Sequence, residues 1–319
     1  MKATSSIQGQ SPAPSLLRSL VRKALPLSIR NRVWHARREG ARVTCRKLLR
    51  KARVAAGLPI AKVRLEEGPI FVDVRDAGIG QVIFDRREYE PNETVAITQN
   101  LRPGSRFVDI GANIGYFSLL ASKLVGPHGR VIAIEPEAHN FRLLSRNIAE
   151  SARSNVTAVN AALGANDGSA VLQRSPTNFG DHRISGRLGG RESQIVPVRT
   201  LDGVLSEAGL ESIDFVKIDV QGYECHVLGG MRHLFEAGRP LTLLCEFWPE
   251  GMKAAGGDPA EFLRIFKTSG FEAALLEPGG IETPVPVESL AEYLPPFDPN
   301  EPDGCFVNVL FRRGTCSNA

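Results

Sequence analysis

Two glycines and a group of polar residues stand where a cofactor could be held. Residues 107–118 read Phe-Val-Asp-Ile-Gly-Ala-Asn-Ile-Gly-Tyr-Phe-Ser, so that Gly111 and Gly115 are four residues apart and follow an apolar run that contains Asp109. Backbone without a β-carbon can approach a ligand closely, and the N-terminus of a following helix would point at the same place. Asp109, Gly111, Asn113 and Gly115 are therefore candidate cofactor-binding residues.

The spacing of these glycines distinguishes between classes of cofactor. A dinucleotide-binding turn has the pattern Gly-x-Gly-x-x-Gly, in which the middle glycine lets the pyrophosphate sit close. Asn113 occupies that middle position here, and the pattern is Asp-x-Gly-x-x-x-Gly. Because there is no phosphate to cradle, S-adenosylmethionine is the favoured ligand, and a nucleotide-binding dehydrogenase is disfavoured.

A second acidic residue follows at a suitable distance. The buried-strand pattern of residues 130–134 is followed by Glu135, twenty residues beyond Gly115. A carboxylate there could bridge the two ribose hydroxyls of a nucleoside. Ala161, directly after a third strand at 156–160, is the remaining cofactor candidate. A glycine pair after a strand and an acid at a strand end each have ordinary structural explanations, but together in register they favour a nucleoside site.

Candidate catalytic residues follow from the chemistry of methyl transfer. The enzyme must align the acceptor with the sulfonium methyl and often removes a proton from the acceptor. Asp219, near the end of the apolar strand 213–220, could act as a base or hold a metal, or could only cap the next helix. Glu246, near the end of strand 241–247, could contact the acceptor or support a turn. His182, in a polar loop, could be a base, although a loop histidine often has no such role.

Strands and helices alternate along the chain and would bring these side chains to one edge of a sheet. Strands are predicted at 107–110, 130–134, 156–160, 170–172, 213–220, 241–247, 272–276 and 305–311, with helices at 117–124, 138–152, 223–237 and 259–269. This order predicts an α/β fold with a doubly wound, mostly parallel sheet. Upstream, Ile70–Val74 and Gln81–Asp85 are predicted to pair as a hairpin, and 90–101 to form a helix. The glycine-rich segment 174–193 is predicted to be an irregular substrate loop.

The combination of motifs resembles the FkbM family of S-adenosylmethionine-dependent O-methyltransferases. The resemblance runs from about Gln81 to Arg312 and is carried by VDIGANIGYFSLLAS, VIAIEPE, NAALGANDG and IDFVKIDVQGYE. It implies a class I, Rossmann-like methyltransferase fold with seven main strands, the last antiparallel, and an acceptor hydroxyl on a sugar, a glycan or a secondary metabolite. The family commonly has Lys-Ile-Asp-Val-Glu-Gly where this chain has Gln221, which removes a carboxylate from the site and weakens a metal-dependent mechanism. No metal ligands are assigned.

The N-terminal part differs in charge from the rest of the chain. Residues 1–64 carry sixteen Lys or Arg and one acid, a charge of +15, which leaves −11 for the remainder because the whole chain carries +4. After a disordered stretch at 1–15, apolar residues recur at helical spacing among basic ones within residues 16–56. This arm could lie on an anionic membrane surface or dock an acidic protein, or its helices could simply pack on the domain. No motif that combines aromatic and basic residues supports nucleic-acid binding.

The chain is therefore expected to comprise a basic, partly disordered helical extension, residues 1–64, and an FkbM-like methyltransferase domain, residues 65–314. No apolar run approaches the length of a membrane span, and no secretory signal is apparent. Five cysteines without a Cys-x-x-Cys pair indicate plain thiols. We expect a cytoplasmic protein, which would be peripheral at the inner membrane surface if the arm binds lipid.

Other functions remain to be distinguished from O-methyl transfer. Nucleic-acid N-methylation is disfavoured because the chain has no [Asp/Asn]-Pro-Pro-[Phe/Tyr] tetrad and no Pro-Cys motif. A non-catalytic member that keeps the cofactor fold and docks into a biosynthetic assembly through its basic arm is the main alternative. Intact Glu135 and an intact glycine turn count against loss of cofactor binding in such a protein.

Overall fold

The computed structural model describes residues 27–184, 192–296 and 305–314. Contacts divide the chain into two units, residues 1–52 and residues 53–319. In the first unit the described residues belong to helix α2 (Leu27–Ala55), which lies within the stretch 16–56 that was expected to be helical. The first part of that stretch, residues 16–26, lies outside the described residues. None of the helices in the described part of the chain is long and apolar enough to cross a membrane.

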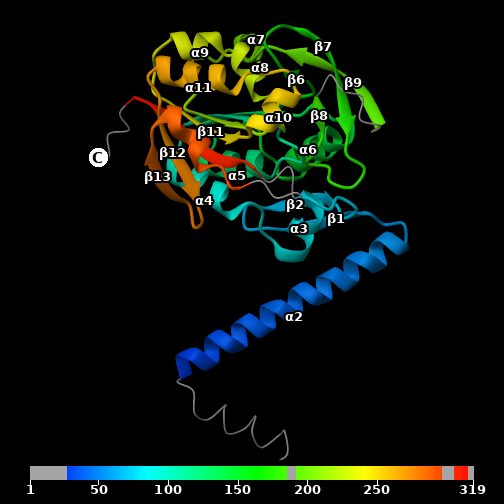
Figure 1. Ribbon diagram of the computed structural model, residues 1–319. Helices are drawn as coiled ribbons and strands as arrows, with labels where there is room; N and C mark the ends of the chain where they lie inside the picture. The colour runs from blue at the N-terminus through cyan, green and yellow to red at the C-terminus, as the bar shows by residue number, and fades with distance from the viewer. Residues whose placement is uncertain (1–26, 185–191, 297–304, 315–319) are drawn as a thin grey trace, which may run out of the picture. The chain divides into compact units, whose positions relative to one another are not determined.

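An eight-stranded sheet forms the centre of the second unit (Figure 1). Its order is β13-β12-β14-β11-β10-β3-β4-β5, and β11, β10, β3, β4 and β5 run parallel, whereas β14 is antiparallel to both of its neighbours. The strands are β3 (Arg106–Ile110), β4 (Arg130–Ile134), β5 (Val156–Val159), β10 (Phe215–Ile218), β11 (Leu241–Phe247), β12 (Glu272–Glu277), β13 (Ile281–Val285) and β14 (Val307–Arg313). The predicted doubly wound, mostly parallel sheet is confirmed.

Helices cover both faces of this sheet (Figure 1). Val108 and Ile110 of β3 face a cluster with residues of α7, α8, α9 and α11, whereas Phe107 faces a cluster with residues of α3, α4 and α5. Both sides of each central strand are therefore apolar, as in buried parallel strands. The helices are α3 (Ile79–Arg86), α4 (Pro91–Asn100), α5 (Tyr116–Val125), α6 (Ala138–Glu150), α7 (Leu201–Glu207), α8 (Glu224–Gly229), α9 (Arg232–Glu236), α10 (Pro249–Ala254) and α11 (Pro259–Thr268), with a 3-10 helix at Val287–Tyr293.

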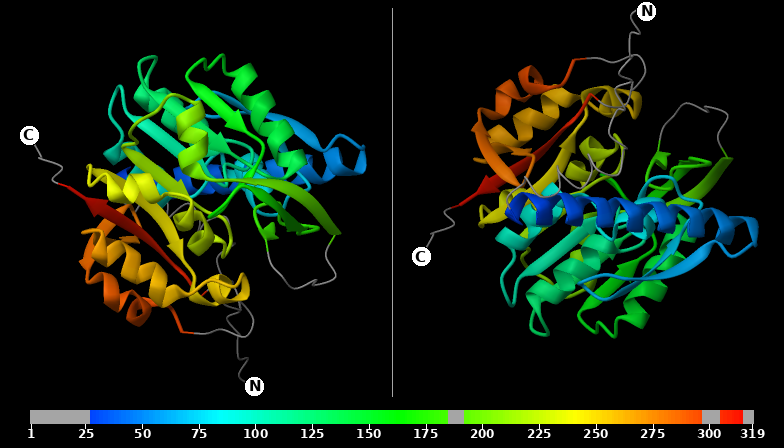
Figure 2. Two further views of the ribbon diagram at one scale, coloured as in Figure 1. Left: turned by 90° about the horizontal axis from the view of Figure 1, so that it is seen from above. Right: turned by 90° about the horizontal axis from the view of Figure 1, so that it is seen from below.

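The seven expected strands are joined by an eighth, β13, at the edge of the sheet. It pairs antiparallel with β12 after a turn in which Gly279 and Gly280 both have positive φ, 83° and 73°. A separate four-stranded sheet contains β6 (Ala162–Leu163), β7 (Gly168–Arg174), β8 (Arg183–Ile184) and β9 (Glu192–Arg199). Figure 2 shows this sheet, in green, on the side of the unit opposite the orange and red strands. Part of the segment predicted to be irregular, 174–193, therefore belongs to β8 and β9.

The predicted hairpin between Ile70–Val74 and Gln81–Asp85 is wrong. Strand β2 (Pro69–Asp73) pairs instead with β1 (Ile60–Arg64), and residues 79–86 form helix α3. The apolar run in α3 is short enough to suit either structure, and the Asp76 carboxylate favours the helix because it accepts the N–H groups of Gly78 and Gly80 at 3.0 and 2.7 Å. Strand β1 precedes residue 65, so it lies on the N-terminal side of the expected domain boundary.

Candidate active site

A pocket with a volume of about 400 Å³ lies beyond the carboxyl ends of β3, β4, β10 and β11. Such a crevice is the usual ligand site in an open α/β sheet. The structure brings seven of the nine residues singled out from the sequence to its lining: Gly111, Asn113, Glu135, Ala161, His182, Asp219 and Glu246. Asp109 and Gly115 lie outside the lining. Asp109 is buried beneath it, where the Ser118 hydroxyl donates to Asp109 Oδ2 at 2.6 Å.

The two glycines of the turn are required by packing within the protein. A β-carbon on Gly111 would lie 1.9 Å from the backbone carbonyl oxygen of Asp219, and one on Gly115 would lie 2.6 Å from Leu144 Cδ1. Both glycines also have positive φ, 82° and 90°. The expected reason for glycine was room for a ligand, whereas the atoms that fill the space at both positions are those of neighbouring segments.

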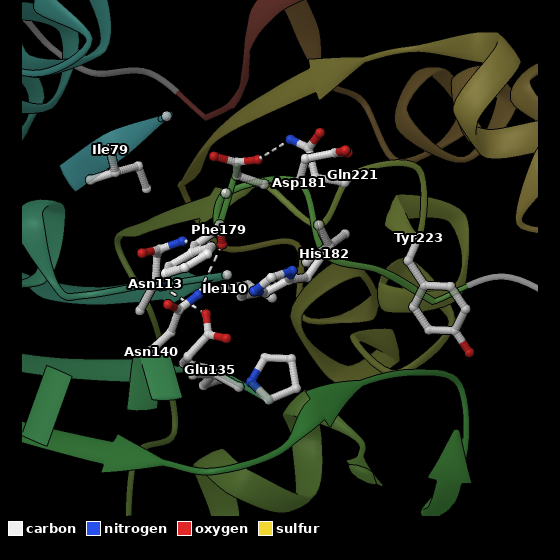
Figure 3. A pocket seen from close by; sticks show the side chains of 18 of the residues that line it. Ile79, Ile110, Asn113, Glu135, Asn140, Phe179, Asp181, His182, Gln221 and Tyr223 are labelled. Carbon is white, nitrogen blue, oxygen red and sulfur yellow. Dashed lines mark hydrogen bonds between the residues drawn. The ribbon is translucent and has the colours of Figure 1, made fainter. Parts of the chain in front are cut away.

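Glu135 fixes the turn that follows β3. Its Oε2 accepts the backbone N–H of Asn113 and its Oε1 accepts that of Glu137, both at 2.8 Å. Burial raises the pKa of Glu135 to about 8, against the lowering effect of these two hydrogen bonds. The side chain lines the pocket beside Asn113 and Asn140 (Figure 3), so its carboxyl group can reach a ligand there.

A loop before β8 is anchored to this end of the pocket. The Phe179 carbonyl accepts hydrogen bonds from Asn113 Nδ2 at 3.0 Å and from Asn140 Nδ2 at 2.9 Å, and its N–H donates to Asp76 Oδ1 at 2.8 Å. Figure 3 shows the Phe179 side chain between these amides and His182. The segment expected to contact a substrate is therefore held against the cofactor turn by side chains from three separate elements.

Polar side chains from β10 and β11 meet at the other end of the pocket, where Figure 3 shows Gln221. Lys217 Nζ donates to Asp219 Oδ2 at 2.9 Å, and Gln221 Nε2 donates to Asp219 Oδ1 at 2.9 Å and to Glu246 Oε2 at 3.4 Å. The amide of Gln221 thus bridges the two carboxyl groups proposed from the sequence. Gln221 holds this position with a positive φ of 52°.

These neighbours drive the pKa values of the carboxyl groups apart. Burial alone would raise the pKa of Asp219, but the Lys217 charge and the two hydrogen bonds lower it. Burial and the charges of Asp219, Glu224 and Glu90 raise the pKa of Glu246 well above its usual range. For Lys217, burial opposes the charged form, but the carboxylates around it dominate and raise its pKa. Groups with separated pKa values side by side are typical of acid–base sites.

His182 is oriented by the backbone. Its Nδ1 accepts the N–H of Ser175 at 3.0 Å, which places the ring proton of a neutral imidazole on Nε2. The ring also stacks with Phe179, with centroids 6.1 Å apart. In this arrangement Nε2 is a hydrogen-bond donor.

The sequence did not single out several pocket residues, among them Asn140, Phe179, Tyr89 and Glu90. Tyr89 and Glu90 precede α4 and line the pocket, and the sequence offers only the Glu-Pro start of a helix as a sign of their position. In the described ranges, no group of three or more His, Cys, Asp or Glu side chains is placed to hold a metal ion.

Known proteins with similar sequences are methyltransferases and a synthetase. Methyltransferase sdnD of Sordaria araneosa is 32% identical over 162 residues, which cover 41% of this chain and 62% of that protein. The antimetabolite synthetase AmbE of Pseudomonas aeruginosa is 29% identical over 222 residues, 57% of this chain and 10% of that protein. Methyltransferase 1 of Beauveria bassiana is 27% identical over 195 residues, 54% of this chain and 75% of that protein. This chain thus spans less than two thirds of the first two relatives.

Solved structures of low sequence identity and one family model also match this chain. A methyltransferase FkbM of Methylobacillus flagellatus has 16% identity and a TM-score of 0.40 over 72% of this chain and 52% of that one. A SAM-dependent methyltransferase of Aquifex aeolicus has 13% identity and a TM-score of 0.36 over 70% and 89%. The model of the methyltransferase FkbM domain matches residues 109–273, more than half of the 319 residues. The chain therefore belongs to the FkbM family of S-adenosylmethionine-dependent methyltransferases.

Proposed function

We propose that the protein transfers a methyl group from S-adenosylmethionine to a hydroxyl group of a sugar, a glycan or a secondary metabolite. The observation that carries this proposal is a single pocket with Glu135 and the glycine turn at one end and Asp219, Gln221 and Glu246 at the other. The first end suits an adenosine, and the second offers carboxyl and amide groups that can bind an acceptor hydroxyl.

The residues at the first end fit the cofactor. The carboxyl oxygens of Glu135, each already accepting one backbone N–H, retain lone pairs for ribose hydroxyls. Gly111, Asn113 and Ala161 line the cavity and would contact the nucleoside or the amino acid portion. Asp109 and Gly115 would act indirectly, by holding the turn in position. Asp109 lies beneath the turn and accepts a hydrogen bond from the Ser118 hydroxyl, and Gly115 is the N-cap residue of α5.

The proposed reaction uses the other end of the pocket. When bound, the cofactor supplies an electrophilic methyl group on a positively charged sulfur. Asp219, held by Lys217 and Gln221, would orient the acceptor through its remaining lone pairs. Burial and neighbouring carboxylates raise the pKa of Glu246, which favours its protonated form, and in that form it would donate a hydrogen bond to an acceptor oxygen. His182 Nε2 would donate another.

The acceptor class draws support from the family and one relative. AmbE is named an antimetabolite synthetase, which supports a product of small-molecule biosynthesis as the acceptor. The basic residues of α2 support a second, separate role for residues 16–56, which is to hold the protein at an anionic membrane surface or an acidic protein partner. Residues 1–64 would then be an arm and residues 65–314 the methyltransferase domain in the cytoplasm.

The test begins with calorimetric titration of the full chain with S-adenosylhomocysteine and, separately, with NAD. Binding of the first ligand only, weakened by Glu135→Ala, is expected. Methyl-labelled S-adenosylmethionine is then incubated with panels of sugars, glycans and hydroxylated metabolites. A labelled product whose NMR spectrum has a methoxy signal supports the proposal. Labelling on nitrogen or carbon only would refute O-methyl transfer, and cofactor binding with no transfer would favour the non-catalytic docking role.

A further inference from the structure

Glu90 occupies a strained backbone position at the edge of the same pocket. It directly precedes α4 and has φ 38° and ψ 73°, a left-handed conformation that costs a residue with a β-carbon about 1–2 kcal/mol. Five non-glycine residues with positive φ occur among those described, and Glu90, Asn113 and Gln221 are the three that line the pocket. Strain of this kind persists where the surrounding structure imposes it, often at functional sites.

The charged groups that face Glu90 come from several elements. Lys217 and Asp219 act on its charge from the end of β10, Glu246 from β11 and Glu93 from α4. The ammonium group of Lys217 is itself bonded to Asp219. Among the described residues, the pocket lining contains one further basic side chain, that of Arg183, which forms an ion pair with Asp181. Glu90 therefore lies in a pocket in which both cations are already bonded to aspartates.

The three carboxyl groups at this end have different acid strengths. Asp219 stays ionised beside Lys217, with one hydrogen bond to each oxygen. Burial and the charges of Asp219, Glu224 and Glu90 raise the pKa of Glu246 well above its usual range, which favours its protonated form. Burial raises the pKa of Glu90 to about 7, with the charge of Lys217 opposing and that of Asp219 adding to the shift. Glu90 can therefore exchange a proton near neutral pH, as a general base should.

We propose that Glu90 faces the transferring methyl group and accepts the proton of the acceptor hydroxyl. This inference rests on the proposed O-methyl transfer. The acceptor oxygen forms a bond to the methyl carbon as the carbon–sulfur bond breaks, and the sulfur keeps that electron pair and becomes a neutral thioether. The hydroxyl proton moves to the Glu90 carboxylate, which releases it to solvent after the product leaves. Asp219 and Glu246 orient the acceptor and are not the base.

The test compares two cofactor analogues by calorimetry at pH 6 and pH 8. Sinefungin carries an ammonium group where the methylated sulfonium stands, and S-adenosylhomocysteine has a neutral sulfur there. Because both contain the same adenosine, titration of Glu135 affects them alike and cancels in the ratio of their affinities. An anionic Glu90 close to the ammonium group attracts it. The ratio of the affinity for sinefungin to that for S-adenosylhomocysteine should therefore be about tenfold higher at pH 8 than at pH 6.

Two variants give the decisive comparison. Glu90→Gln should abolish the gain between pH 6 and pH 8 in sinefungin affinity relative to S-adenosylhomocysteine affinity. Glu93→Gln changes a buried carboxyl group on α4 that does not line the pocket, and it should retain the gain. If Glu90→Gln keeps the full gain, the inference is overturned while the proposed function stands. If the wild type binds neither analogue, both are overturned.

Turnover supplies a second readout with the acceptor found in the labelling panel. Glu90→Gln should lower kcat by at least about a hundredfold and remove the acidic limb of the pH profile near pH 7, whereas Glu90→Asp should restore part of the rate. If the pH profile of Glu90→Gln is unchanged, another group is the base and the inference is overturned.

Discussion

Gly111 lies so close to Asp219 that a β-carbon on the glycine would be 1.9 Å from the aspartate carbonyl oxygen. The contact joins the turn after β3 to the end of β10, the two segments that carry cofactor and acceptor residues. It explains how two segments far apart in the sequence keep a fixed spacing at the site.

Substitution of Gly111 should therefore damage the fold as well as ligand binding. Gly111→Ala combines left-handed strain with a clash against backbone, and we expect a loss of roughly 2–4 kcal/mol in the free energy of unfolding. Gly104 also has positive φ, 89°, but open space around its missing β-carbon. Gly104→Ala should cost only about 1 kcal/mol. Urea denaturation of both variants measures the difference, and equal losses would contradict the clash.

The glycine turn could be predicted because its signals are local. An apolar strand, two glycines and a periodic helix follow one another within residues 107–124, and the carboxylates Glu135 and Asp219 each directly follow a strand. Parallel strands place such residues at one sheet edge. The same reasoning predicted that Glu246 lies at this edge of the sheet, where it lines the pocket.

The features that could not be predicted depend on contacts between residues far apart in the sequence or on individual side-chain interactions. Residues 79–86 form a helix because of the Asp76 carboxylate and because Gly80 packs against the Asp73 carbonyl, where a β-carbon would lie 2.0 Å away. Glu90 enters the site through its positive φ and through neighbours on β10, 127 or more positions along the chain. No local pattern encodes such a meeting.

Glu135 should make folding stability depend on pH. Burial raises its pKa from 4.5 to about 8, so between these values the folded state holds a proton that the unfolded chain releases. The free energy of unfolding should then fall as the pH rises through this window. Glu135→Gln should show a shallower fall in urea denaturation between pH 5 and pH 9. Glu250→Gln, at an exposed glutamate, is the matched control and should keep the wild-type slope.

The amide of Asn140 should hold the Phe179 loop in place. Asn140→Ala removes one of two hydrogen bonds to the Phe179 carbonyl, and hydrogen exchange of residues 175–182 should become faster. A weaker affinity for S-adenosylhomocysteine, by about three- to tenfold, should accompany it. Asn100→Ala, which removes bonds within α4 and to Arg312, should leave exchange in the loop unchanged. Unchanged exchange in the Asn140 variant would show that Asn113 alone suffices.

The basic residues of α2 should bind anionic vesicles. Sedimentation of the full chain with phosphatidylglycerol vesicles should be strong and should weaken with salt, and replacing Arg42, Lys47 and Lys51 with Gln should lower the affinity about a hundredfold. The control replaces Lys253, Arg264 and Lys267, three exposed cations of α10 and α11, with Gln. Equal losses in the two triple variants would indicate attraction by overall charge, and no vesicle binding at all would favour an acidic protein partner.

Gln221 should be needed as an amide. It donates to Asp219 and to Glu246, and a glutamate in its place would lose both donated bonds and add a third carboxyl group. Repulsion grows as these groups ionise, so the melting temperature of Gln221→Glu should fall more between pH 6 and pH 8 than that of the wild type. Gln221→Asn keeps an amide and suits the left-handed backbone, and it should follow the wild-type profile. If Gln221→Glu also follows that profile, the amide bridge does not hold the two carboxyl groups together, and the departure from the common family residue would have no structural cost.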